Sequence, residues 1–398
     1  MIGNKKIYLD YAASTPVSPE VISVMEKYWS GVFANPGSLH SCGHEALIAV
    51  DNARDVLKKF LGAQYSREII FTGSATEANN LAIRGLISRL KKKNPNAGKL
   101  HIITSAIEHK SVLEPVRMLE KEGVIDADYL VADGEGYISP RQVLNAIRPE
   151  TVLVSMGYAN NEIGVIQHIS KIGSMIRDLG RDDLYFHTDA AQAAQFLDMN
   201  VENLKVDLMT LSAQKIYGPK GVGALYIKEG IKLEPILFGG GQEYGLRSST
   251  ENVPLIAGFA EAVRLLGEKD HKESATRINE MRSALSGELE EIFPRAFLNG
   301  PKENRLANNI NLCLGALVDG ESLLIMLSEK GVCVSSGAAC AGRAQKPSHV
   351  LRAIGRSEKE ARASIRITLG RNTTSQEINQ FKAIFVDLIK KFIYNKVK

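Results

Sequence analysis

Short apolar runs alternate with amphipathic segments between about residues 68 and 227. The apolar runs are bounded by Gly, Ser or Asp, which is typical of buried strands. They predict strands at 69–72, 101–105, 128–131, 151–156, 184–188, 207–211 and 223–227. The amphipathic segments predict helices at 75–92, 111–122, 140–147 and 168–179. Near-continuous apolar strands separated by helices favour a mainly parallel sheet covered on both faces.

The pattern changes after Gly239. It predicts one long helix over 254–291, strands at 308–314, 332–335 and 364–369, a helix at 321–330 and a final helix from Gln376. Antiparallel strands with helices on one face suit an α+β unit. We therefore expect an α/β protein with a large domain over 15–255. Residues 1–14 and 256–398 are expected to form a smaller α+β domain.

Composition bounds the class of protein. A chain of 398 residues has room for two or three domains at roughly 100–200 residues each. With 44% hydrophobic and 24% charged residues it is a folded globular chain, and a net charge of +4 gives no reason to expect a direct nucleic-acid partner. Without an apolar signal region or an 18-residue apolar run, we expect neither secretion nor a membrane partner, and place the protein in the cytoplasm.

Four cysteines are too few for a disulfide framework and include no C-x-x-C pair, which favours free thiols in a reducing compartment. Cys313 and Cys333 lie in apolar runs and are predicted to be core thiols. Cys340 lies among small residues in a predicted loop, where the nearby Arg343 favours its thiolate. The purpose of Cys42 stays open.

The segment His40-Ser-Cys42-Gly-His44 offers three potential metal ligands. Its i, i+2, i+4 spacing matches neither a zinc finger nor an H-E-x-x-H helix, so no metal site is predicted.

Polar residues at the ends of three predicted strands are candidates for chemistry. Ser74 and Thr76 begin a helix and suit either an anion site or ordinary capping. Asp189 ends a strand, where it is equally a ligand for a cationic ring nitrogen or a cap. Lys215 leaves a strand and is a candidate Schiff-base amine, with Lys220 in the next turn as its competitor. Each of these signals is weak alone.

The order of the motifs is specific. The chain carries Asn160-Asn-Glu-Ile-Gly164, Asp189-x-x-Gln192, Lys215 before Tyr217-Gly-Pro-Lys-Gly221, Arg247-Ser-Ser-Thr250 and Ser335-Ser-Gly-Ala-Ala-Cys340. This series resembles the cysteine desulfurases of the NifS/IscS type, class V aminotransferases of pyridoxal-phosphate fold type I. The resemblance covers essentially the whole chain. It implies pyridoxal 5'-phosphate as cofactor, a sulfur-transferring enzyme and a homodimer.

The resemblance also implies a function for individual residues. Lys215 would carry the cofactor as a Schiff base, Asp189 would pair with the ring nitrogen, and His109 would stack on the ring and exchange protons. The other residues implied to bind the cofactor are Ala75, Thr76, Asn161, Gln192, Ser212 and Gln214, with Thr250 reaching the phosphate bound by a second copy. Arg366 would hold the substrate carboxylate, assisted by Asn35.

The implied reaction removes sulfur from L-cysteine, giving L-alanine and a persulfide on Cys340. An acceptor protein would then take that sulfur for iron–sulfur cluster assembly, tRNA thiolation or DNA sulfur modification. The chain departs from the family in three places: Gln214 replaces the usual His, Gly73-Ser74 replaces Ser-Gly, and Ala338 replaces a common Ser. The last departure leaves the acceptor open.

Two other interpretations remain at this point. One is a different class V reaction, such as selenocysteine lysis or transamination, which would not need the loop thiol of Cys340. The other is a catalytically silent protein that keeps the fold as a binding platform, against which the intact Lys215, Asp189 and His109 argue. A Rossmann-type nucleotide binder is disfavoured, because the chain lacks the glycine fingerprint.

Overall fold

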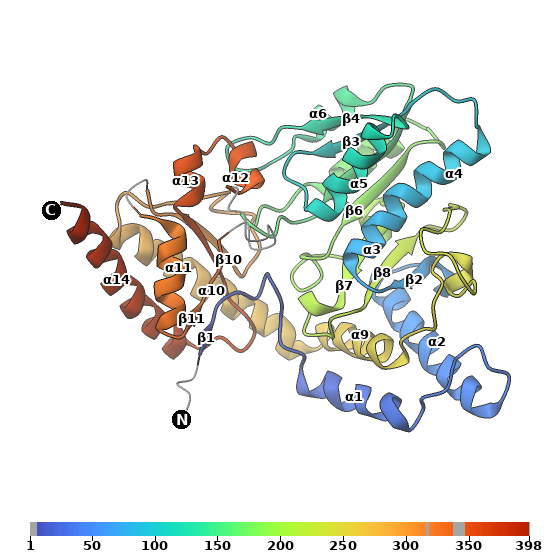
Figure 1. The fold of residues 1–398 in the computed structure, drawn as a ribbon, viewed down its shortest axis with the longest axis horizontal. Coiled ribbons are helices and arrows are strands. Elements are labelled where there is room, and N and C mark those ends of the chain that lie inside the picture. The colour runs from blue at the N-terminus through green and yellow to red at the C-terminus, as the bar shows by residue number, and fades with distance from the viewer. Residues whose placement is uncertain (1–5, 316–317, 337–346, 398) are drawn as a thin grey trace.

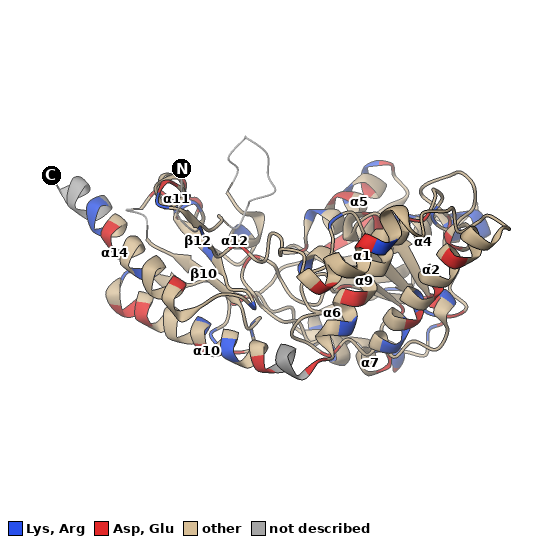
Figure 2. Ribbon diagram, turned by 90° about the horizontal axis from the view of Figure 1, so that it is seen from below, with Lys and Arg blue, Asp and Glu red and all other residues tan. Residues whose placement is uncertain are grey.

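A computed structural model of the chain describes residues 6–315, 318–336 and 347–397. These residues form a large lobe around one sheet and a smaller lobe that contains both ends of the described chain (Figure 1). Acidic and basic side chains are interspersed along the outer helices of both lobes (Figure 2). Within the described residues, no helix is long and apolar enough to cross a membrane.

The large lobe is built on a sheet that has seven strands among the described residues, in the order β2-β8-β7-β6-β5-β3-β4. The strands are β2 (Ile69–Thr72), β3 (Leu100–Ser105), β4 (Ile125–Leu130), β5 (Thr151–Gly157), β6 (Tyr185–Asp189), β7 (Leu208–Ser212) and β8 (Gly223–Ile227). Only β8 runs against its neighbours, so the carboxyl ends of the other six meet at one edge. The mainly parallel sheet predicted from the apolar runs is confirmed.

Both faces of this sheet are buried under helices. Because successive side chains of a strand point to opposite faces, each strand contributes to two hydrophobic clusters. In β2, Ile69 and Phe71 join one hydrophobic cluster and Ile70 joins the other. The helices between residues 19 and 266 that contribute to the first cluster are α1 (Pro19–Ser30), α2 (Ser41–Leu61), α6 (Pro140–Ala146), α7 (Ile169–Arg177), α8 (Val201–Leu204) and α9 (Val253–Leu266). Those of the second are α3 (Ala75–Asn80), α4 (Leu86–Lys93) and α5 (Lys110–Lys121). A π-helical turn at Leu81–Gly85 joins α3 to α4.

The small lobe has its own hydrophobic cluster, between an antiparallel sheet in the order β12-β10-β9 and the helices that cover it (Figure 1). The strands are β9 (Phe297–Leu298), β10 (Asn309–Cys313) and β12 (Ser364–Thr368), with β1 (Ile7–Tyr8) and β11 (Val332–Cys333) as a parallel pair. The helices of this cluster are α10 (Lys269–Ile292), α11 (Gly320–Glu329) and α14 (Ser375–Val397). Two short helices, α12 (His349–Ala353) and α13 (Glu358–Arg362), instead contribute Val350, Leu351 and Ala361 to the first cluster of the large lobe.

The prediction of one helix over 254–291 is wrong. The structure has two helices, because α9 ends at Leu266 and α10 begins at Lys269. The buried side chains of α9, as far as Leu266, pack in the large lobe. The domain boundary after residue 255 stays a prediction, and a boundary between α9 and α10 fits these contacts better.

The two lobes meet at the turn formed by residues 160–164. Side chains of the small lobe donate to the main-chain carbonyls of three consecutive residues of this turn. The bonds are Arg366 Nη1 to Asn161 O (3.1 Å), Asn309 and Asn311 Nδ2 to Glu162 O (3.2 and 3.1 Å) and Arg305 Nη2 to Ile163 O (2.7 Å). The turn is therefore held from the small lobe through its backbone.

Candidate active site

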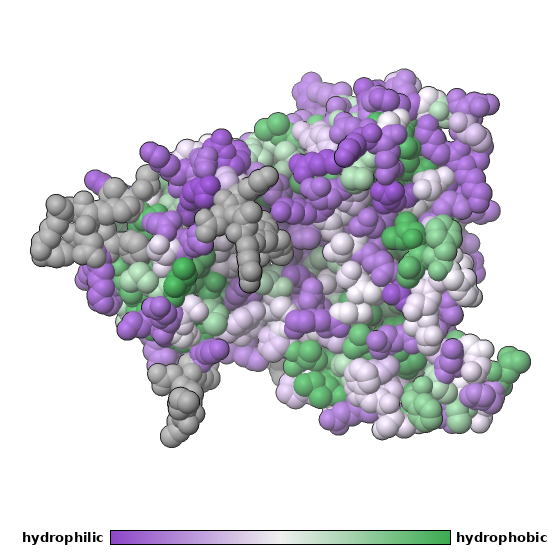
Figure 3. Space-filling view, viewed as in Figure 1, coloured by the Kyte–Doolittle hydropathy of each residue, from purple (hydrophilic) through white to green (hydrophobic). Residues whose placement is uncertain are grey.

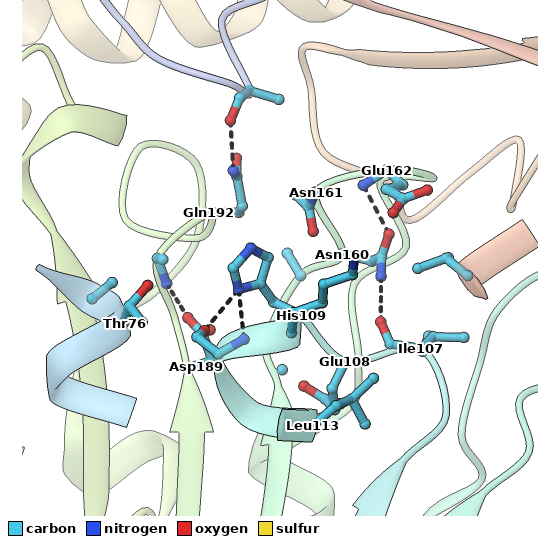
Figure 4. A pocket seen from close by; sticks show the side chains of 18 of the residues that line it. Thr76, Ile107, Glu108, His109, Leu113, Asn160, Asn161, Glu162, Asp189 and Gln192 are labelled. Carbon is cyan, nitrogen blue, oxygen red and sulfur yellow. Dashed lines mark hydrogen bonds between the residues drawn. The ribbon is translucent and has the colours of Figure 1, made fainter. Parts of the chain in front are cut away.

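A cavity of about 570 Å³ opens at the edge of the large sheet where the parallel strands end. Its lining comes from the segments that follow β2, β3, β5, β6 and β7, from Ala12 and Ala13 of the N-terminal segment, and from Arg366 and residues 347–350. Parallel α/β sheets bind ligands at this edge, because the loops after the strands converge there. Figure 4 shows the side chains that point into the cavity.

The turn from β2 into α3 forms one end of the cavity. Ser74 caps α3 by accepting from the N–H of Glu77 (3.1 Å), and Glu77 accepts in return from the N–H of Gly73 (2.8 Å). The start of β8 packs directly against this turn. A Cβ on Gly223 would lie 2.7–2.8 Å from the backbone of Ser74 and Ala75, so a glycine is needed there. The capping interpretation of Ser74 is confirmed, and Ala75 and Thr76 also line the cavity.

Asp189 stands at the carboxyl end of β6 and is fixed by two donors. Asn79 Nδ2 donates to Oδ2 (2.8 Å), and the N–H of Ala191 donates to Oδ1 (3.0 Å). The second bond is a local turn contact between residues two apart, and no helix begins at Asp189, so the helix-cap interpretation is wrong. The first comes from a fully buried side chain of α3, and it holds the carboxylate in the cavity lining.

His109 lies beside Asp189 and caps α5 (Figure 4). The N–H of Ser111 donates to its Nδ1 (3.1 Å), so Nδ1 is an acceptor and the proton of the neutral ring is on Nε2. The Ser111 hydroxyl also contacts Nδ1 (2.7 Å) and accepts from Asn79 Nδ2 (2.8 Å). Asn79 therefore connects His109 to Asp189 through Ser111, a link that no sequence motif indicated.

Lys215 ends a short 3₁₀ turn after β7 and lies between the strand edge and the N-terminal segment. Its Nζ donates to the carbonyls of Ala12 (2.6 Å) and Ala13 (2.7 Å). Gln192 Nε2 donates to the same Ala12 carbonyl (2.9 Å), as drawn in Figure 4. Lys220 is exposed and is absent from the cavity lining, so of the two candidate lysines only Lys215 faces the cavity.

Arg366 of β12 reaches the cavity from the small lobe. Its side chain is 3% exposed and forms an ion pair with Asp10, with 2.8 Å between Nη2 and Oδ1. Two of its five N–H donors are used by Asp10 and by the Asn161 carbonyl. Its Nε has no hydrogen-bond partner among the described residues.

Two buried carboxyls flank the cavity. The Ser105 hydroxyl donates to Glu108 (2.5 Å), and the Ser348 hydroxyl donates to Glu162. Burial raises the pKa of Glu108 and that of Glu162 from 4.5 to about 7. The motif around residues 160–164 was visible in the sequence, but nothing in it marked Glu162 as buried. The main chain of Glu108 also bonds His349 Nε2 (2.9 Å), so both carboxyl residues contact the start of α12.

Most of the predicted site residues share this cavity. The lining includes Ala75, Thr76, His109, Asn161, Asp189, Gln192, Ser212, Gln214, Lys215 and Arg366. Asn35 and Thr250 are exposed and are absent from it. Cys340 lies outside the described residues, although the residues on both sides of that segment approach the site: Ser335 pairs through its backbone with Arg366, and Ser348 lines the cavity.

The other cysteines separate partly as expected. Cys313 is buried, which confirms the core thiol, whereas Cys333 is only half-buried, so that expectation is wrong in part because β11 is a short strand at the edge of the lobe. Cys42 is exposed. His40 caps α2 by accepting from the N–H of Gly43 (3.2 Å). Among the described residues, no group of His, Cys, Asp and Glu has the arrangement of a metal site.

Comparison with known proteins identifies this arrangement. The family model described as "Aminotransferase class-V" matches residues 7–381, so the chain belongs to the class V aminotransferase family. Within that family it falls among the cysteine desulfurases of the NifS/IscS type. It is 44% identical over 387 residues to "Cysteine desulfurase IscS" of Dictyoglomus turgidum, covering 97% of this chain and 95% of that protein.

Solved structures show the same fold. A structure named "NIFS-LIKE PROTEIN" superposes with a TM-score of 0.88 at 32% identity, covering 97% of this chain and 99% of the other. A second, "SspA in complex with cysteine", has a TM-score of 0.78 at 39% identity, covering 93% and 100%. The fold is therefore that of the NifS-like proteins of pyridoxal-phosphate fold type I.

The residues present fit pyridoxal 5'-phosphate. A carboxylate suited to a protonated ring nitrogen (Asp189), a lysine amine (Lys215) and the hydroxyls of Ser74, Thr76 and Ser212 all line one cavity. Its volume of about 570 Å³ is within the usual range for small-molecule sites. The close packing of Gly223 on the β2–α3 turn presents helix-start N–H groups and hydroxyls at one end, which suits a phosphate.

Proposed function

We propose that this protein is a pyridoxal-phosphate-dependent cysteine desulfurase. It converts L-cysteine and the Cys340 thiol into L-alanine and a Cys340 persulfide. The bond from Cβ to sulfur breaks, a bond between the two sulfurs forms, and a proton completes the methyl group of alanine. The observation that carries the proposal is the convergence of Lys215, Asp189 and Arg366 on one cavity.

The cofactor, when bound, supplies an electron sink for the electrons released at Cα of the substrate. Asp189 would keep the ring nitrogen protonated, and its bonds from Asn79 and Ala191 hold the carboxylate in place for this. His109 would stack on the ring, and Asn161, Gln192, Ser212 and Gln214, which line the same cavity, would bind the rest of the cofactor. Gln214 stands where the family usually has His, so it can donate a hydrogen bond but cannot change charge.

Two cationic side chains act on the substrate. Arg366 binds the α-carboxylate with its planar fork of donors, which favours one orientation of L-cysteine. The amine of Lys215 takes the proton from Cα as general base. The carbonyl oxygens of Ala12 and Ala13 accept hydrogen bonds from this amine and direct it along the cavity lining.

The thiolate of Cys340 accepts the substrate sulfur and then passes it to an acceptor protein. Support comes from the described residues on either side of the 337–346 segment. Ser335 exchanges two backbone hydrogen bonds with Arg366 (2.6 and 3.1 Å), and Pro347 and Ser348 line the cavity. The segment that carries Cys340 is thereby attached at both sides to the place where the substrate would bind. Acceptors of iron–sulfur cluster assembly, tRNA thiolation or DNA sulfur modification all fit this chemistry.

Lysine and cysteine variants test the proposal. The loaded protein is expected to absorb in the visible region, and Lys215→Ala removes that band, whereas Lys220→Ala retains it. With L-cysteine as substrate, Cys340→Ser lowers alanine release more than tenfold, while Cys42→Ser does not change it. Alanine release that continues at the normal rate in Cys340→Ser contradicts the persulfide step. A protein that remains colourless with added cofactor instead favours a binding platform.

We also propose that the active form is a homodimer. Large apolar side chains are exposed around the end of α1 and the loop after it, notably Trp29 (60%), Phe33 (75%) and Leu39 (104%). Apolar surface of this kind is visible at the α1–α2 end of the large lobe in Figure 3, and contiguous exposed apolar patches mark interaction sites. The predicted site residues Asn35 and Thr250 are also exposed, away from the cavity of their own chain.

Replacing two of these apolar residues tests the dimer. Trp29→Lys combined with Phe33→Lys is expected to shift the sedimentation coefficient to that of a monomer, because charges would be buried in the interface. Ile325→Lys, an equally drastic change at an exposed position of α11, is the control. A double variant that sediments like the unmodified protein contradicts this interface.

A further inference from the structure

The N-terminal segment Leu9–Ala13 contacts three of the residues assigned to the site. Asp10 pairs with Arg366, the carbonyl of Ala12 accepts from Lys215 and Gln192, and the carbonyl of Ala13 accepts from Lys215. Sequence motifs marked the partners of these bonds but not Asp10. Its carboxylate is a second negative charge on the arginine that would bind the substrate carboxylate.

The position of Asp10 is fixed by the strand that carries Arg366. Thr368 of β12 donates its N–H to Leu9 O (2.8 Å), and its Oγ1 accepts from the N–H of Ala12 (3.0 Å). Arg366 lies two residues before Thr368, on the same face of the strand. These two hydrogen bonds attach the segment that carries Asp10 to the strand that carries Arg366, so the two side chains are held beside each other.

A close contact secures the same segment from the other side. A Cβ on Gly370 would lie 2.1–2.3 Å from ring atoms of Tyr11, so the aromatic ring packs directly on the backbone of residue 370. Tyr11 also edge-packs against Tyr8, whose hydroxyl donates to Asp10 O (3.1 Å). With its backbone anchored before and after it, Asp10 has little freedom to move away from Arg366.

Asp10 stands behind the guanidinium rather than inside the cavity. Arg366 is part of the cavity lining and Asp10 is not. The pair uses one Nη2 donor, at 2.8 Å, and Asn161 O uses one Nη1 donor, which leaves Nε and one proton on each Nη for a ligand. A carboxylate that binds from the cavity would therefore meet Arg366 while Asp10 remains paired with it, with the two negative charges a few ångströms apart.

We propose that Asp10 is a positioning residue that orients Arg366 and limits its affinity for the α-carboxylate, so that L-alanine can leave after each turnover. The inference rests on the proposed function, because it takes Arg366 as the carboxylate-binding residue. Substrate and product carry the same α-carboxylate, so an Arg366 with too high an affinity for this group would slow the release of L-alanine. The carboxylate of Asp10 repels the α-carboxylate of the ligand, because both contact the same guanidinium. When no substrate is bound, Asp10 balances the positive charge of the buried Arg366.

The direction in which carboxylate affinity changes when Asp10 is replaced separates the proposed function from a merely structural one. Asp10→Asn keeps an oxygen acceptor where Oδ1 stands and removes the charge. Like charges separated by a few ångströms near a protein surface repel appreciably, so removing one tightens carboxylate binding by about tenfold, or about 1.4 kcal/mol. Loss of a merely structural contact would weaken binding instead.

The experiment measures binding of propionate to the cofactor-loaded protein by calorimetry, since propionate has the carboxylate but no amine to react. We expect the Kd for propionate to fall about tenfold in Asp10→Asn. The KM for L-cysteine and the inhibition constant for L-alanine should fall with it, and kcat should fall where alanine release limits turnover. Asp183→Asn is the matched control, because Asp183 pairs with Arg181 at 2.9 Å on the exposed surface.

An unchanged or raised Kd for propionate in a folded Asp10→Asn protein overturns the inference. Should that variant not fold, Asp10→Ser also removes the charge and retains an acceptor, and it must likewise tighten binding. The proposed function fails separately: an unmodified protein that binds propionate, loses this binding in Arg366→Ala and yet releases no alanine contradicts the reaction, while the effect of Asp10 stays measurable.

Discussion

Among the residues that the structure describes, two buried arginines pair with carboxylates, one in each lobe, and the geometry of the two pairs differs. Arg54 of α2 meets Glu243 with two parallel bonds (2.8 and 2.9 Å), and both side chains are almost fully buried. Glu243 also accepts from the N–H of Phe71 (2.9 Å), and the guanidinium lies 5.0–5.1 Å from the ring centroids of Phe71 and Tyr244. Neither Arg54 nor Glu243 lines the cavity of the candidate active site.

Arg366, by contrast, is held by one bond to Asp10 and faces the cavity. Both arginines are buried and each has a carboxylate partner, so burial of the arginine alone does not distinguish a structural ion pair from one that serves a site. The two pairs differ in how many guanidinium N–H donors the carboxylate occupies: two in Arg54 and one in Arg366. A bidentate pair locks the guanidinium, whereas a single bond orients it and leaves a fork of donors for an incoming anion.

The largest expected effect is on the structural pair. Glu243→Ala leaves the buried guanidinium of Arg54 without its partner, which costs about 3–5 kcal/mol of unfolding free energy. Urea unfolding followed by circular dichroism measures it. The double variant Arg54→Met with Glu243→Leu is expected to regain most of the loss, because it removes both charges together. A loss below about 1 kcal/mol in Glu243→Ala would contradict the structural function of the pair.

A smaller effect is expected from the buried carboxyl of Glu162, which is near Arg366 but has no bidentate partner. Burial raises its pKa from 4.5 in the unfolded chain to about 7 in the folded one. The folded state therefore binds the proton more tightly, and this contribution is present below pH 4.5 and is lost as pH rises towards 7. At 1.36 kcal/mol per pKa unit the loss is about 3 kcal/mol.

Glu162→Gln tests this directly, since glutamine stays neutral at every pH. The unfolding free energy of the variant should fall less than that of the unmodified protein between pH 4.5 and 7, as measured by urea unfolding at several pH values. Glu114→Gln, at an exposed position of α5, is expected to leave the pH dependence as it is. Equal slopes for Glu162→Gln and the unmodified protein would show that Glu162 ionises normally.

The smallest expected effect concerns Arg366 itself. Arg366→Lys keeps the charge but replaces the planar fork by a point charge, which Asp10 would then attract. The KM for L-cysteine should rise roughly 10- to 100-fold, while the unfolding free energy changes by less than about 1 kcal/mol. Initial rates and urea unfolding measure the two, with Arg181→Lys as control. A large loss of stability with an unchanged KM would make Arg366 a structural arginine like Arg54.

Much of the fold was predictable because the strands are buried on both faces. The expected strands at 69–72 and 223–227 match β2 and β8, and the others agree within a few residues. The break between α9 and α10 was missed because Gly267 and Glu268 do not interrupt the helical periodicity, and a glycine inside such a pattern is tolerated. The π-helical turn at Leu81–Gly85 has no signal in the pattern either.

The site was predictable where a residue follows a strand of the large sheet. Asp189, Lys215 and His109 do so, and the parallel topology brings them together. Asn79 and Asp10 were missed because they act through another side chain, and their contacts depend on how α3 and the N-terminal segment pack. That information lies in the tertiary arrangement, not in spacing along the chain.

The hydrogen bonds from the small lobe to the 160–164 turn have a consequence for the evolution of such a protein. The donors Arg305, Asn309 and Asn311 bind main-chain carbonyls, which every amino acid possesses. A substitution in the turn can therefore alter a side chain facing the cavity without breaking the junction between the lobes. Side chains of the 160–164 turn that line the cavity can therefore vary during evolution, while the hydrogen bonds that join the two lobes are retained.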